Sequence, residues 1–128
     1  MKKLILLIMI AVIGLLAVSC SRKAEPVVLP ARDTIDSIDV TIGDEAVNYS
    51  DDDWISRFVS AVLDAEGTRR QSIQDMPNED EYIKIDINCR GSVNTLFVYK
   101  EKEIYYIEQP YQGIYQTDAS FYEMLIGK

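Results

Sequence analysis

The chain has 128 residues, with 21 Asp or Glu against 13 Lys or Arg, so its formal net charge at pH 7 is −8. This acidity excludes most nucleic-acid binders, because phosphate backbones are bound by basic stripes and the chain has none. The chain also has no histidine, which excludes Ser–His–Asp and Cys–His catalytic systems and histidine-containing zinc sites.

The N-terminus has the three regions of a secretory signal peptide. Lys2 and Lys3 precede an apolar run of about 15 residues, and the run ends in small residues. This run is short for a membrane-spanning helix, which needs about 20 apolar residues. An uncleaved membrane anchor and an ordinary secreted protein remain alternatives. The motif LAVSC resembles the lipobox of bacterial lipoproteins, in which the cysteine becomes the first mature residue and carries the lipid. We therefore expect residues 1–19 to be a lipoprotein signal peptide and Cys20 to be lipidated.

Lipidation at Cys20 predicts an extracytoplasmic protein anchored in the cell membrane by acyl chains such as palmitate. Ser21 follows the cysteine, so the aspartate that retains lipoproteins at an inner membrane is missing, and the outer leaflet of a Gram-positive membrane is expected. Cleavage removes two lysines and no acid, which makes the mature charge 11 minus 21, or −10. Cys89 then has no disulfide partner within the chain; a small buried side chain and a reactive thiol both remain open.

A connecting segment precedes the predicted domain. Residues 20–34 contain Pro26 and Pro30 and show neither helical nor strand periodicity. This composition predicts a flexible, extended tether in which about 14 residues reach about 40 Å. Residues 35–128 are predicted to form a single α+β domain without internal repeats.

The domain begins with a predicted strand and a predicted helix. In "TIDSIDVTIG", apolar residues at 38, 40 and 42 alternate with polar ones, and a Gly-Asp pair ends the strand. The helix is expected to follow Ser50 as its N-cap and to end just before Gly67. Its apolar stripe comprises Trp54, Ile55, Phe58, Val59 and Val62. The aspartates at 51–53 suit the positive helix end better than a calcium loop, which places its oxygens at alternate positions.

The second half of the domain is predicted to contain a sheet and a short helix. Residues 68–81 are expected to be a polar loop with a short strand around Ser72 to Gln74. The runs "YIKIDINC", "SVNTLFVYK" and "EIYYIEQPY" predict an antiparallel meander. A C-terminal helix follows, capped by Thr117 or Asp118. The fold class is α+β, in the order β-α-β-β-β-α, with an antiparallel sheet of four to five strands. A strongly bent sheet that wraps the long helix is the alternative.

Tyrosine is concentrated near the C-terminus. Seven of the eight tyrosines follow residue 81, and four fall within "YYIEQPYQGIY". Tyrosine is enriched at contact surfaces, although it is also common on ordinary strands. Pro110 should end the strand, and a turn there would project Tyr111 and Tyr115 beside Glu108, as a surface for a basic or amphipathic peptide. In the alternative arrangement both rings cover the terminal helix.

The same region carries a family resemblance. "YIEQPYQGIYQTDASFYEML" resembles the C-terminal signature of a family of small lipoproteins and exported domains from Gram-positive bacteria, a family classed as a domain of unknown function. The resemblance covers most of residues 35–126 and is strongest from Tyr106 to Leu125. It implies a shared fold and a cell-surface setting. It supplies no catalytic residue, cofactor or partner.

Three functional hypotheses follow. The first is a membrane-tethered binding or interaction module that recognises a peptide or an envelope protein. The second is a structural or accessory subunit that modulates a membrane complex. A hydrolase is a distant third, because no motif assigns catalytic roles, and we expect neither enzyme activity nor a cofactor or metal.

Overall fold

The computed structural model of the chain describes residues 23–128. The predicted signal peptide and the lipidation site Cys20 lie outside the described residues and stay predictions. Within the described part, no helix combines the length and the apolar character that crossing a membrane requires.

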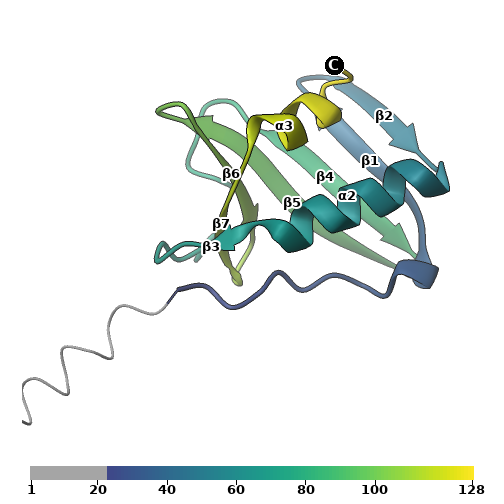
Figure 1. The fold of residues 1–128 in the computed structure, drawn as a ribbon, viewed down its shortest axis with the longest axis horizontal. Coiled ribbons are helices and arrows are strands. Elements are labelled where there is room, and N and C mark those ends of the chain that lie inside the picture. Colours follow the sequence, from purple (N-terminus) through teal and green to yellow (C-terminus); the bar gives the residue numbers. More distant parts are fainter. Residues whose placement is uncertain (1–22) are drawn as a thin grey trace, which may run out of the picture.

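The domain is an α+β fold in which one antiparallel sheet carries two helices (Figure 1). The sheet has seven strands in the order β2-β1-β4-β5-β6-β7-β3, so the fold class is confirmed, whereas the expected four to five strands are too few. The elements are η1 (Arg32–Thr34, a 3-10 helix), β1 (Ile35–Ile42), β2 (Glu45–Tyr49), α2 (Asp52–Asp64), β3 (Glu66–Gly67), β4 (Ile83–Cys89), β5 (Ser92–Glu101), β6 (Ile104–Gln109), β7 (Gly113–Thr117) and α3 (Ala119–Leu125).

The strands β2, β3 and β7 are not predicted from the sequence. The side chains of β2 are mostly exposed, so this strand lacks the apolar alternation of a half-buried strand. β3 is only two residues long and is defined by its pairing with β7. The short strand expected around Ser72 to Gln74 does not form, because these residues belong to an irregular segment between β3 and β4.

The helix α2 connects the two edges of the sheet, because it follows the edge strand β2 and precedes the opposite edge strand β3. Seven strands spaced about 4.8 Å apart would span about 29 Å if the sheet were flat. A helix of 13 residues is about 20 Å long. The sheet therefore curves around α2 (Figure 1), which favours the bent-sheet alternative.

The predicted apolar stripe of α2 forms the centre of the core. Its buried members are Trp54, Ile55, Phe58 and Val62. The Trp54 ring stacks on Tyr49 of β2 with 3.8 Å between centroids. Phe58 lies between Trp54 and Phe121 of α3, with 5.7 Å between centroids in each pair. One core thus joins β2, α2 and α3.

The meander of β4, β5 and β6 is confirmed, with short polar connections between its strands. The alternation in β4 also holds, since Ile83, Ile85 and Ile87 are buried. Cys89 is half-buried against the core, which is the position expected of a small apolar side chain.

Asp51, and not Ser50, is the N-cap of α2. Its carboxylate accepts a hydrogen bond from the Trp54 backbone N–H at 2.9 Å. Gly67 does not cap the other end, because the chain leaves the helix in an extended conformation at Ala65 and reaches Gly67 within β3. For α3 the cap is Asp118, whose carboxylate accepts from the backbone N–H of the third residue of the helix at 2.9 Å.

Replacing Asp51 with alanine should lower the free energy of unfolding by about 1 kcal/mol, because the first turn of α2 loses its acceptor. Ser50→Ala is the matched control and should change it by less than about 0.5 kcal/mol. Urea denaturation measures both variants. Equal losses would show that the helix begins elsewhere.

The segment before β1 lies on the domain instead of hanging free. The side-chain amide of Gln109 donates to the Val28 carbonyl at 2.7 Å and accepts from the Val28 N–H at 2.9 Å. The Ala24 N–H donates to the Thr68 carbonyl at 2.7 Å, and Val27 is buried. These contacts fix the segment from Ala24 onward.

Two glycines permit this close approach. A Cβ atom added to Gly67 would lie 2.6 Å from the Ala24 carbonyl oxygen, and one added to Gly113 would lie 2.5 Å from the Ala24 Cβ. A side chain at either position would therefore displace the segment. Within the described residues 23–34, the expected flexible tether is corrected: residues 23–31 form a strap that is packed on the sheet, and the 3-10 helix η1 follows.

Candidate functional site

The predicted corner after β6 forms, but with a different geometry. β6 ends at Gln109, as Pro110 requires, and the Gln112 N–H donates to the Gln109 carbonyl at 3.0 Å, which closes a tight turn. The residue with a positive φ is Tyr111, at 62°, whereas Gly113 lies in β7. The third position of a type II turn favours glycine, because a Cβ is strained there. Tyr111 therefore occupies a costly backbone position.

Glu108 is buried on the sheet face opposite α2, since its neighbour Ile107 points into the helix-covered core. The carboxylate is 1% exposed and accepts hydrogen bonds from Ser72 Oγ at 2.9 Å and the Tyr99 hydroxyl at 3.2 Å. Burial and the nearby carboxylate raise the pKa of Tyr99, so this residue stays a neutral donor at physiological pH. The Glu108 carboxylate is satisfied internally and cannot reach a ligand at the surface.

Tyr111 and Tyr115 do not form a shared surface. Tyr115 is 1% exposed and belongs to the core, and its hydroxyl donates to the Glu25 carbonyl of the N-terminal strap. Tyr111 is 66% exposed, and its hydroxyl donates to Asp75 Oδ1 at 2.6 Å. The predicted binding constellation of Glu108, Tyr111 and Tyr115 is corrected, because only Tyr111 is accessible.

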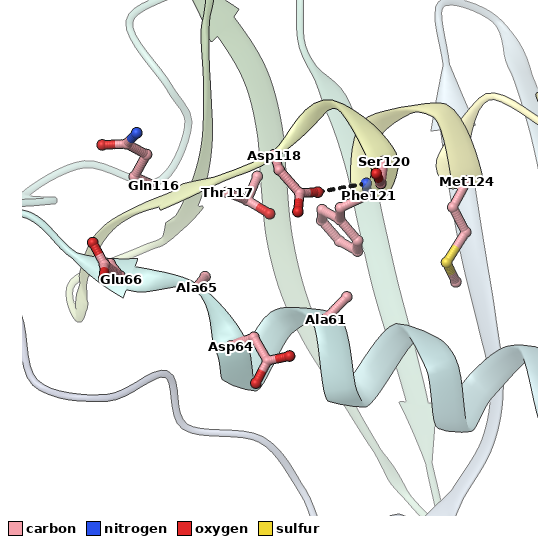
Figure 2. A pocket seen from close by; sticks show the side chains of 10 residues that line it. All are labelled: Ala61, Asp64, Ala65, Glu66, Gln116, Thr117, Asp118, Ser120, Phe121 and Met124. Carbon is pink, nitrogen blue, oxygen red and sulfur yellow. Dashed lines mark hydrogen bonds between the residues drawn. The ribbon is translucent and has the colours of Figure 1, made fainter.

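A cleft lies between the C-terminal end of α2 and the start of α3 (Figure 2). Its volume is 460 Å³, within the range of small-ligand sites. Ala61 of α2 and Phe121 of α3 point toward one another across the gap (Figure 2). Its lining residues are Ala61, Asp64, Ala65, Glu66, Gln116, Thr117, Asp118, Ser120, Phe121 and Met124. The cleft, which we call the α2–α3 cleft, thus combines three carboxylates and no cation with an apolar floor.

Comparison with known proteins places the chain in a family. Residues 23–116 match the family DUF5301, described as "Domain of unknown function (DUF5300)". The chain belongs to the DUF5301 family. An NMR structure of a protein from Ruminococcus gnavus is 36% identical to this chain with a TM-score of 0.69, and the match covers 78% of this chain and 99% of that one. No curated protein matches the chain.

The DUF5301 match begins at residue 23, so it includes the strap that packs on the sheet. The sequence pattern alone predicts a domain that begins at residue 35. The strap lacks the periodicity of a helix or strand. It is held on the sheet by hydrogen bonds to Gln109 and by close packing of Ala24 on two glycines. The sequence carries no local signal of these contacts, because each partner is distant along the chain.

The α2–α3 cleft of this DUF5301 domain concentrates negative potential. Asp64 is the last residue of α2, where the helix dipole already carries about half a negative charge. The last turn of α2 contains no basic residue, and none of the salt bridges within residues 23–128 involves Asp64 or Glu66. The third carboxylate, Asp118, is occupied as the cap of α3. Two carboxylates therefore remain to meet a ligand.

Among the polar residues of the α2–α3 cleft, the sequence singles out only Thr117 and Asp118, and it does so as alternative caps of the C-terminal helix. A usable signal was present in Asp64, since an acid at a helix C-terminus opposes the dipole and costs about 0.3–1 kcal/mol. An acid in an unfavourable position indicates a functional site more strongly than the three aspartates at the N-terminus of α2, because those three stabilise the helix there. In residues 23–128, no group of three or more Cys, Asp or Glu side chains is arranged to hold a metal ion.

Proposed function

We propose that this chain is a lipid-anchored, extracytoplasmic binding module that recognises a cationic segment of a peptide or envelope protein in the α2–α3 cleft. The lipid anchor is supported by the signal-peptide pattern and by LAVSC. The binding role is supported chiefly by one observation: Asp64 and Glu66 stand at the negative end of α2 without a cation among the residues that line the cleft.

The composition of the cleft suits binding and not catalysis. Phe121, Met124 and two alanines give an apolar floor for the stem or ring of a bound side chain, and the carboxylates at the rim suit an ammonium or guanidinium group. A volume of 460 Å³ accommodates one or two side chains. The proposed ligand therefore presents a basic residue next to an apolar one.

The test uses the synthetic peptide amide Lys-Phe-Lys-Lys and isothermal titration calorimetry at low salt. We expect the double variant Asp64→Asn, Glu66→Gln to bind this peptide about tenfold more weakly, since two exposed ion pairs contribute about 1.4 kcal/mol in total. The peptide Glu-Phe-Glu-Glu should not bind the unmodified domain.

A stability measurement separates a binding site from a structural one. Asp64→Asn alone should raise the free energy of unfolding by about 0.3–1 kcal/mol, because it removes an unfavourable interaction with the helix dipole.

The matched control for the peptide titration is Asp44→Asn, Glu45→Gln, which removes two exposed acids at the β1–β2 turn. Unchanged peptide affinity in the cleft variant, or an equal loss in the control, would contradict the proposed site.

A further inference from the structure

The N-terminal strap limits how far the domain can stand from a membrane. Ala24 is hydrogen-bonded to Thr68 and packed against Gly67 and Gly113. Only three residues lie between Cys20 and Ala24, and an extended chain over this spacing of four positions spans at most about 14 Å. A lipid on Cys20 would therefore hold the domain against the membrane with one particular end facing it.

That end of the domain is built from three segments that are distant in sequence. Residues 23–25 of the strap, residues 69–73 after β3 and residues 111–112 of the β6–β7 turn line a common opening of 410 Å³. In Figure 1 the start of the strap lies at the same side of the molecule as β3 and β7, away from β2. The geometry of the strap thus selects the surface that a lipid on Cys20 would bring to the bilayer.

The charge of this surface differs from that of the whole domain. Its lining includes three cations, Lys23, Arg69 and Arg70, and one carboxylate, Glu25, although the mature chain is expected to carry 11 basic against 21 acidic residues. Arg70 forms a salt bridge with Glu101 at 3.1 Å, whereas no salt bridge within residues 23–128 involves Lys23 or Arg69. Basic residues beside a lipid anchor are attracted to anionic head groups. The acids of the α2–α3 cleft lie outside this opening. Gly113 packs against Ala24 at the opening, whereas Gln116, three residues further along β7, lines the cleft. Three residues of a strand span about 10 Å.

The same surface also exposes apolar side chains. Ile73 is 76% exposed and Tyr111 is 66% exposed, and both line this opening. Tyr111 holds its exposed position at a positive φ of 62°, a conformation that a glycine would adopt at lower cost. An apolar residue and a tyrosine ring among cations form the combination that suits the interface between head groups and acyl chains.

We propose that the surface formed by Lys23, Arg69, Arg70, Ile73 and Tyr111, the anchor-side surface, rests on anionic phospholipid and fixes the orientation of the domain on the membrane. This inference rests on the lipid anchor of the proposed function and adds a second, non-covalent contact with the lipid. In this arrangement the domain does not rotate freely on a tether, and its β2 edge points away from the bilayer.

The experiment uses the full-length lipoprotein, purified from membranes and reconstituted into vesicles of phosphatidylglycerol and phosphatidylcholine. A single fluorophore is attached in a Cys89→Ser background at Ile73→Cys on the anchor-side surface. The control site is Val47→Cys on β2, which is 50% exposed at the opposite edge of the sheet. Phospholipids with a nitroxide on the head group should quench the fluorophore at position 73 and leave the one at position 47 bright.

Equal quenching at the two positions would overturn the proposed orientation. Protection of position 73 from a soluble quencher without quenching by the nitroxide lipid would assign the surface to a protein, and would also overturn it. The anchor is tested separately by Cys20→Ala, which should release the protein from cell membranes; retention there would contradict the anchor whatever the labels show.

A strap variant tests the mechanism of orientation. Gly67→Ala places a Cβ 2.6 Å from the Ala24 carbonyl oxygen, so it should detach the strap and lower the lipid quenching at position 73 to the level at position 47. Far-UV circular dichroism and a cooperative thermal transition verify that the domain remains folded. Full quenching in a folded Gly67→Ala variant with a detached strap would show that the strap does not set the orientation.

Discussion

Replacing Phe58 with alanine should lower the free energy of unfolding by about 3–5 kcal/mol. The side chain is fully buried and packs between the rings of Trp54 and Phe121. Its removal would leave a cavity at the point where α2 meets α3, and aromatic rings on either side cannot collapse into that space without leaving their own contacts. Urea denaturation followed by circular dichroism measures the change.

Leu63→Ala on the same helix is the matched control for Phe58→Ala. Leu63 is 59% exposed, so its truncation should change the free energy of unfolding by less than about 0.5 kcal/mol. Comparable losses in the two variants would show that α2 presents a different face to the sheet.

Tyr115→Ser should destabilise the domain by about 3–5 kcal/mol, whereas Tyr111→Ser should change stability by less than about 0.5 kcal/mol. Both residues follow the same proline in a short stretch of sequence, but Tyr115 is 1% exposed and Tyr111 is 66% exposed. Urea denaturation of the two single variants distinguishes the core residue from the surface residue. A large loss in Tyr111→Ser would show that its bond to Asp75 holds the irregular segment on the sheet.

Tyr115→Phe separates the ring from its hydroxyl. The hydroxyl donates to the Glu25 carbonyl, so this variant should lose about 1 kcal/mol and keep the core ring in place. It should also loosen the strap, which hydrogen exchange at the Ala24 amide would detect. Unchanged protection of that amide would mean that the strap is held by Gln109 and the glycines alone.

The fold class and several of its elements follow from local pattern. The stripe of α2, the alternation of β4 and the cap Asp118 depend on residues within a few positions of one another, and the structure confirms them. Strands without a buried face give no such pattern. β2 is exposed and β3 has two residues, so both were missed.

The face on which a side chain lies could not be predicted in the same way. Alternation shows that Ile107 and Glu108 point to opposite faces of β6, but it does not show that the second face is covered. Ser72, 36 positions away, donates to the Glu108 carboxylate across that face and belongs to an irregular segment with no periodicity of its own. An acid expected at the surface is therefore buried.

The sequence by itself determined the helix faces and the meander, because each depends on neighbouring residues. Export and lipidation at Cys20 stay predictions from the sequence. The tertiary structure alone decided that the segment from Ala24 onward is packed on the sheet, and that Asp64, Glu66 and Asp118 line one cleft. Both results require chain segments that are distant in sequence to meet. The physical reason is that a missing Cβ at Gly67 or a carboxylate at a helix end has meaning only when its neighbour in space is known.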